Sequence, residues 1–264
     1  MLANSGVNLP NEGIFHAYRT WSEGGWGIII TGNICLDRTH LGTPNDVAMP
    51  NPGSLSKEAK KAFREYAASI KGKNDSSSPL AIAQLVHAGR QSMRGSGRAP
   101  WKPALAPSAV PVRASGLGPI GRVLDWALFG TCVEMTKEQI ADLVERFAAA
   151  SEVLHEAGFD GIEIHASHGY QIAAFLSPRT NLRTDEYGRD ARGRVRLLLE
   201  IVDAVRKRVP STFAVGVKLS SSDYIQGGLT EEDALTNVQW LAEHGGVDFV
   251  EISGGNYENP CEYG

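Results

Sequence analysis

Short, nearly continuous apolar runs alternate with longer stretches of helical periodicity along the chain. Five runs predict β-strands, at Gly27–Thr31, Leu80–His87, Gly161–His165, Phe213–Leu219 and Asp248–Ile252. These runs do not alternate polar and apolar residues, which is typical of parallel strands covered by helices. The repeated order of strand and helix therefore predicts an α/β fold with a parallel sheet.

Four helices are predicted around these strands, over Ser54–Lys71, Thr136–Ala157, Ala191–Val209 and Thr230–His244. In the second of them, apolar residues recur at helical spacing. This helix opens with Thr136 and Gln139 at the spacing of a capping box, in which two backbone N–H groups are satisfied reciprocally. Gly158 marks its end, because a left-handed residue costs least there.

Residues 88–134 form a long insertion rich in proline, glycine and arginine. A segment of this length without clear structure is typical of a functional lid, or of elements that the pattern does not reveal. No repeat or linker divides residues 1–264, which predicts a single domain. A closed (β/α)8 barrel needs eight strands, and an open, doubly wound sheet of the flavodoxin type fits five. The pattern alone leaves an incomplete barrel and an open sheet as alternatives.

The composition narrows the class of protein. The chain is 42% hydrophobic, which is enough for a sizeable core, and its net charge of −4 argues against a nucleic-acid-binding protein. Its apolar runs are too short for a membrane span and no signal peptide is visible, so we expect a cytoplasmic protein. Cys35, Cys132 and Cys261 are widely spaced and are expected to be reduced thiols. The sequence leaves the oligomeric state open, a homo-oligomer included.

The residues that most strongly indicate chemistry follow the third predicted strand. His165, His168 and Tyr170 lie within six residues, at the strand end where parallel α/β folds place their sites. Two imidazoles can ligate a metal, for which His-x-x-His is weakly suggestive. They can equally polarise a carbonyl, with the phenol as proton donor. These residues alone leave both chemistries open.

Further motifs lie in the same order at Ala83–Arg90, His165–Gly188, Val217–Leu219 and Glu251–Pro260. Together they resemble the Old Yellow Enzyme family of NADH:flavin oxidoreductases, over essentially the whole chain. The resemblance implies a (β/α)8 TIM barrel of which the five predicted strands are strands 2–6. It also implies FMN at the C-terminal strand ends, NADH or NADPH as electron donor, and a small-molecule substrate.

The family's catalytic roles carry over by position. His165 and His168 match the pair that hydrogen-bonds the carbonyl oxygen of an enone, which stabilises the enolate that develops. The second position is asparagine in some members of the family. Tyr170 matches the residue that donates a proton to the α-carbon.

The cofactor-binding roles carry over in the same way. Gln84 matches the amide that binds the polar edge of the flavin pyrimidine ring, since an amide offers donors and an acceptor. Lys218 matches a cation beside flavin N1 and O2, where it favours the anionic reduced ring. Asn33 falls where the second barrel strand passes the flavin, with its backbone expected to make the contact.

The resemblance also implies parts that this sequence does not show. The family's first strand would precede Leu2, and its seventh and eighth strands, which hold the FMN phosphate, would follow Gly264. Because backbone N–H groups at that anchor neutralise the phosphate, we expect the isolated chain to retain FMN weakly. A bright yellow 264-residue protein that keeps stoichiometric flavin through gel filtration would contradict this expectation.

Two further functions stay open. One is a non-catalytic remnant of the family that is stable only with a partner completing the barrel. The other is a metal-dependent barrel hydrolase that uses His165, His168 and Asp223, although the resemblance assigns no metal. Zinc analysis beside a visible flavin spectrum separates the hydrolase from the oxidoreductase.

Overall fold

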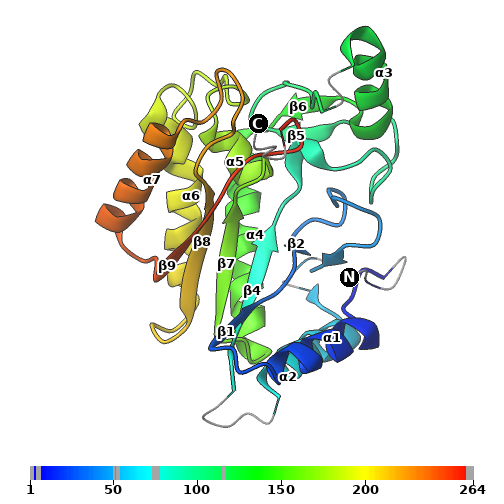
Figure 1. Cartoon of the computed structure of the whole chain (residues 1–264), viewed down its shortest axis with the longest axis vertical. Coiled ribbons are helices and arrows are strands. Elements are labelled where there is room, and N and C mark those ends of the chain that lie inside the picture. Colours follow the sequence, from blue (N-terminus) through cyan, green and yellow to red (C-terminus); the bar gives the residue numbers. More distant parts are fainter. Residues whose placement is uncertain are drawn as a thin grey trace.

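The computed structural model describes residues 3, 7–49, 51, 54–72, 78–114 and 117–259, so that Pro260 and Cys261 lie outside the described residues. Its main element is a parallel sheet with the strand order β3-β2-β4-β7-β8-β9, in which β1 also pairs with β4 (Figure 1). The strands are β1 Ile28–Ile30, β2 Ile34–Cys35, β3 Val47–Ala48, β4 Leu80–Val86, β7 Gly161–Ala166, β8 Ala214–Ser220 and β9 Phe249–Ser253. All five predicted strands are present.

The strands β1 and β2 are two parts of one interrupted strand along β4. Ile28 pairs with Leu80 and Ile34 with Leu85, so six steps on the interrupted strand oppose five on β4. One extra residue in a strand is a bulge, which bends the strand and redirects its side chains. The bulge falls between β1 and β2, at the stretch that contains Asn33.

The order of the strands decides between the two predicted folds. The interrupted strand, β4, β7, β8 and β9 lie side by side in chain order, without the reversal that defines a doubly wound sheet. The two-residue strand β3 lies on the outer side of β2. Among the helices, α4 packs against α6 and α6 against α7, as successive helices around a barrel do. The fold is therefore an incomplete (β/α)8 barrel, as expected.

The helices follow the predicted segments closely. The four predicted helices are α2 Lys57–Lys71, α4 Lys137–Glu156, α6 Ala191–Arg206 and α7 Glu231–His244. Two further helices, α1 Glu12–Ser22 and α5 Gln171–Leu176, lie outside the predicted segments. The capping box is confirmed, because Thr136 and Gln139 each accept a hydrogen bond from the backbone N–H of the other. Gly158 has a φ of +96° just after the end of α4, which also agrees with the prediction. None of the described helices is long and apolar enough to cross a membrane.

The insertion at 88–134 contains more structure than its sequence indicates. It holds the short 3-10 helix η2 Gly89–Gln91, the strands β5 Ala104–Ala106 and β6 Cys132–Glu134, and the helix α3 Gly118–Phe129. The strands β5 and β6 form a separate two-stranded parallel sheet above the carboxyl ends of the barrel strands (Figure 1). The insertion is thus placed where a lid over the barrel would lie.

Candidate active site

The polar residues of the sheet share one face near the carboxyl ends of its strands. Gln84 of β4 lies opposite Glu163 of β7, while His165 lies opposite Lys218 of β8. Lys218 in turn lies opposite Glu251 of β9. Side chains two residues apart in a strand point to the same face, and paired residues of adjacent strands share that face. The strand register therefore places Gln84, His165 and Lys218, three of the six predicted site residues, beside two carboxyl groups.

Direct hydrogen bonds connect these groups in pairs. Gln84 Nε2 donates to Glu163 Oε2 at 2.6 Å, and Lys218 Nζ donates to Glu251 Oε1 at 2.6 Å. Burial and the neighbouring Glu251 raise the pKa of Glu163 to about 7. Burial acts to raise the pKa of Glu251 too, but hydrogen bonds from Glu163 and Lys218 outweigh it and lower that pKa. Of the two carboxyl groups, Glu163 is therefore the one that holds a proton closer to neutral pH.

This set of groups fits the polar edge of a flavin ring. The Gln84 amide has both donors and an acceptor, and Lys218 supplies a positive charge two strands away. Glu163 Oε1 is buried and receives no hydrogen bond from the described residues. The amide and the cation are the kinds of group that bind the carbonyl and N–H edge of a flavin pyrimidine ring.

His165 and His168 are adjacent, with ring centroids 5.0 Å apart and ring planes at 73°. Ser167 N donates to His165 Nδ1 at 3.3 Å, which leaves the ring proton on Nε2. His168 Nε2 lies 2.6 Å from Ser253 Oγ. Burial and the positive charge of Lys218 lower the pKa of both histidines. Both imidazoles are consequently neutral at neutral pH and each can donate one N–H.

The turn after β7 fixes the direction of His168. His168 and Gly169 have φ values of +59° and +73°, in the left-handed region. A Cβ on Gly169 would lie 2.6 Å from Gln91 Oε1, so this position requires glycine. Gln91 Nε2 donates to the His168 carbonyl oxygen at 2.8 Å, and His168 N donates to Ser220 Oγ at 3.2 Å. The turn is therefore held from the insertion, at Gln91, and from β8.

Tyr170 completes the group. Its ring stands edge-on to His165, with centroids 4.9 Å apart, and its hydroxyl oxygen lies 3.1 Å from the Tyr257 hydroxyl oxygen. Asn33 Nδ2 donates to the Tyr170 hydroxyl oxygen at 3.5 Å, so the Asn33 side chain also faces the site. Burial, with Tyr257 adding to it, raises the pKa of Tyr170 well above its ordinary value. The phenol therefore keeps its proton and can donate it.

The structure disagrees with the metal-dependent hydrolase alternative. Asp223 accepts hydrogen bonds from Ser177 Oγ at 2.5 Å and from Leu229 N at 2.8 Å. His165, His168 and Asp223 do not bring three ligand atoms together. In the described part of the chain, Asp37, His40 and His87 are the one group of three such side chains with ligand atoms within 4.8 Å of one another.

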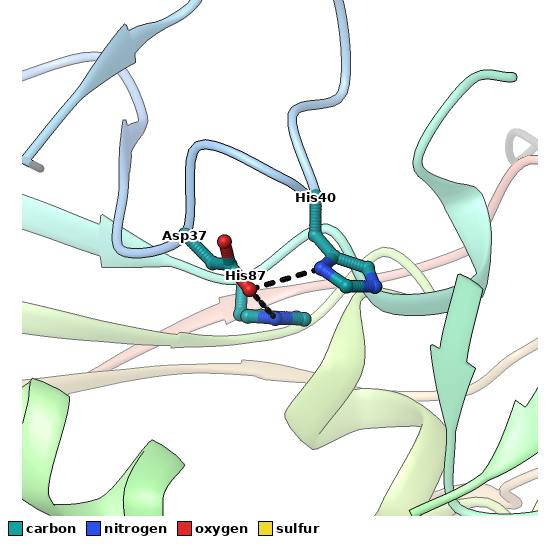
Figure 2. Close-up of side chains that lie close together, drawn as sticks. All are labelled: Asp37, His40 and His87. Atoms are coloured by element: carbon teal, nitrogen blue, oxygen red, sulfur yellow. Dashed lines mark hydrogen bonds and ion pairs between the residues drawn. The ribbon is translucent and has the colours of Figure 1, made fainter. Parts of the chain in front are cut away.

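Figure 2 shows that one oxygen of the Asp37 carboxylate faces both imidazoles of this group. Asp37 Oδ2 is 2.9 Å from His40 Nδ1 and 3.6 Å from His87 Nε2. The rings of His40 and His87 are stacked, with centroids 4.8 Å apart. Burial acts to raise the pKa of Asp37, but hydrogen bonds from both histidines outweigh it and lower that pKa far below its ordinary value.

The other nitrogen of each ring decides what this group can do. Leu105 N donates to His40 Nε2 at 3.1 Å, and Gly89 N donates to His87 Nδ1 at 3.1 Å. The nitrogens that face Asp37 therefore carry the protons. A metal ion there would displace these protons onto nitrogens that already accept backbone N–H groups. The group is built as a hydrogen-bonded anchor between the segment after β2, the end of β4 and β5 of the insertion.

Sequence reasoning missed several residues of this region. Tyr257, Glu251 and His87 all lie within the family motifs, which was the available signal, but the motifs assign no role to them. Asp37 and His40 carry no motif, and their partner His87 is far from them in sequence. Pairing of β2 with β4 brings the three together.

The fold and this arrangement define a barrel protein with its site at the carboxyl ends of the strands. Residues 3–258 match the model of the NADH:flavin oxidoreductase / NADH oxidase family, which includes nearly the whole chain. The chain belongs to this family, which confirms the resemblance to the Old Yellow Enzyme family and the expected FMN and nicotinamide cofactors of its class.

Curated relatives are similar over 97% of this chain. It is 38% identical to the NADH-dependent flavin oxidoreductase iliE of Neonectria sp. (strain DH2) and 39% identical to the NADH-dependent flavin oxidoreductase iccE of Talaromyces variabilis. The chain spans 32% of the length of the first and 60% of the second.

Solved structures agree with the fold. A 2-naphthoyl-CoA reductase complex has a TM-score of 0.82 at 23% identity, with 98% of this chain and 37% of that chain covered. The old yellow enzyme homologue from Zymomonas mobilis has a TM-score of 0.76 at 24% identity, with 96% of this chain and 68% of that chain covered. These similarities support the incomplete barrel.

Proposed function

We propose that the chain carries the acceptor site and part of the flavin site of an FMN-dependent oxidoreductase. NADH or NADPH would reduce the flavin, and an activated alkene such as an enone would accept the electrons. The observation that carries the proposal is the grouping of two neutral imidazoles with a protonated phenol, beside the Gln84 and Lys218 face.

The cofactor-binding roles follow from chemistry. FMN, when bound, supplies the hydride that reaches the β-carbon of the acceptor. Gln84 would bind the polar edge of the pyrimidine ring through its amide. Lys218 would stabilise negative charge on the reduced ring, and Glu163 and Glu251 hold these two residues in position. Asn33 would approach the ring from the bulge between β1 and β2.

The acceptor roles follow from the protonation states. His165 and His168 would donate N–H groups to the acceptor's carbonyl oxygen, where negative charge develops as the alkene is reduced. Tyr170 would then donate its hydroxyl proton to the α-carbon. Because all three groups are held before the acceptor binds, little reorganisation is required of them.

The decisive experiment supplies excess FMN, NADH and cyclohexenone to the purified chain without oxygen and measures cyclohexanone. We expect flavin-dependent product formation. His168→Leu should slow it by about 10²-fold or more, because one donor to the oxyanion is lost. His168→Asn is the matched control, since an amide keeps an N–H donor. Absence of product at saturating FMN would favour the non-catalytic remnant.

A further inference from the structure

Glu258 places a buried negative charge beside this site, in the segment after β9. Its side chain is 4% exposed, and the buried guanidinium of Arg90 donates to Glu258 Oε1 at 2.8 Å. The backbone N–H of Arg113 donates to the same oxygen at 3.1 Å. Arg179 Nη2 donates to Oε2 at 3.3 Å. A buried carboxylate is tolerated only with such partners, so four segments distant in sequence are joined at this one group.

Arg90 binds the insertion from the other side. Its Nη1 donates to the carbonyl oxygens of Val110 and Pro111, at 3.2 and 3.1 Å. Residues 110–113 have no helix or strand of their own. Arg90 binds the carbonyl groups of Val110 and Pro111, and Glu258 binds the N–H of Arg113, so this ion pair holds both ends of the segment. In Figure 1 the segment after β9 reaches the region of β5 and β6, which agrees with these contacts.

The sequence neighbours of the ion pair contact the candidate site itself. Tyr257 N donates to Gln91 Oε1 at 3.2 Å, and Gln91 Nε2 donates to the His168 carbonyl oxygen at 2.8 Å. The Tyr257 hydroxyl oxygen lies 3.1 Å from that of Tyr170. Two contacts thus lie next to each other: Arg90 binds Glu258, and Gln91 binds Tyr257. One contact holds the insertion, and the other holds the residues proposed to act on the acceptor.

We propose that Glu258 is a positioning residue that holds residues 110–113 of the insertion against the Tyr170 side of the site. By fixing this segment and the neighbouring Tyr257, it sets one wall of the acceptor site. The effect on the acceptor rests on the proposed function, whereas the position of the insertion does not.

Trypsin provides a direct test, because Arg113 is exposed while its backbone N–H is held by Glu258. The variant Glu258→Gln keeps the size of the side chain and removes its charge. We expect cleavage after Arg113 to become about tenfold faster or more, since cleavage follows the population of the open segment. Amide hydrogen exchange should rise over residues 104–114 and stay unchanged in β7 and β8.

The control is Glu145→Gln, which removes the charge from an exposed ion pair with Arg208. It should leave cleavage after Arg113 at the wild-type rate. Arg179→Gln removes the longer and more exposed contact of Glu258, so it should accelerate cleavage less than Glu258→Gln does. If Glu258→Gln loses exchange protection in β7 and β8, its barrel is disturbed as a whole. The test of the inference is then the rate of cleavage after Arg113 in Arg179→Gln.

Kinetics separate this inference from the proposed function. With excess FMN, Glu258→Gln should raise KM for cyclohexenone severalfold more than it lowers kcat. If the wild-type chain forms no product but the variant is cleaved faster, the proposed function fails while Glu258 remains a positioning residue of the insertion. Equal cleavage and exchange in the wild type and both variants would overturn the inference.

Discussion

Replacement of Tyr170 by phenylalanine is expected to slow reduction of the enone by about 10²- to 10⁴-fold, the range that a general acid contributes. The variant loses the hydroxyl proton but keeps the ring that packs edge-on to His165. The measurement is stopped-flow reoxidation of the reduced flavin by cyclohexenone. Reduction of the flavin by NADH should be unchanged, because that half-reaction requires no proton from Tyr170.

Tyr224→Phe is the matched control for this prediction. Tyr224 is 45% exposed, and its hydroxyl oxygen lies 3.2 Å from Ser221 Oγ, so its removal should leave both half-reactions intact. The raised pKa of Tyr170 adds a second expectation. The enone half-reaction should not decline with pH up to about 10, the ordinary pKa of a tyrosine. If Tyr170→Phe reoxidises as fast as the wild type, another group supplies the proton.

Replacement of Asp37 by alanine is expected to lower the free energy of unfolding by about 3 kcal/mol. The buried imidazoles of His40 and His87 lose the carboxylate that they face, and Thr39 N loses its acceptor, while each donor left unsatisfied costs about 1–3 kcal/mol. For a chain of this size the midpoint of thermal unfolding should fall on the order of 10 °C. Denaturant titration and calorimetry measure the two quantities.

Asp203→Ala is the control, because it removes the carboxylate of an exposed Asp–His pair, with His244. Such pairs contribute about 1 kcal/mol or less, so little change is expected. A loss of stability in Asp37→Ala no larger than in Asp203→Ala would contradict the role of Asp37 as an anchor.

The same group predicts how stability depends on pH. Burial lowers the pKa of His40 from 6.5 to about 4 against the opposing effect of Asp37. The unfolded chain therefore binds a proton near pH 6.5, whereas folded His40 binds it only near pH 4. The free energy of unfolding therefore has its full value above pH 6.5, where His40 is neutral in both states. It decreases by about 3 kcal/mol as the pH falls from 6.5 to about 4. His40→Gln should lack this part of the dependence.

The sequence predicted the elements whose local pattern matches their burial. The run at Gly161–His165 is apolar enough to indicate a strand, and Thr136 with Gln139 defines the start of α4 without reference to the rest of the chain. The strand β2 was missed because a bulge separates it from β1. The helix α3 was missed because many of its apolar side chains, Ile120 and Val123 among them, are exposed, so its pattern has no clear buried stripe.

The candidate site was predictable where its residues are close in sequence. His165, His168 and Tyr170 belong to one strand end, and their grouping is a local property of β7 and its turn. The partners of these residues were not predictable. Glu251 binds Lys218, and Tyr257 contacts Tyr170, only because parallel pairing places the ends of β7, β8 and β9 side by side.

By itself, then, the amino-acid sequence determined that this is a parallel α/β chain with a pair of histidines and a tyrosine after one strand, and its motifs identified the family. Only the tertiary structure decided that the strands follow one another around a barrel and that Asp37, His40 and His87 form an anchor. It also joined Glu258 to the insertion. The physical reason is range: periodicity and capping act within a few residues, whereas hydrogen bonds between strand ends depend on where distant segments meet.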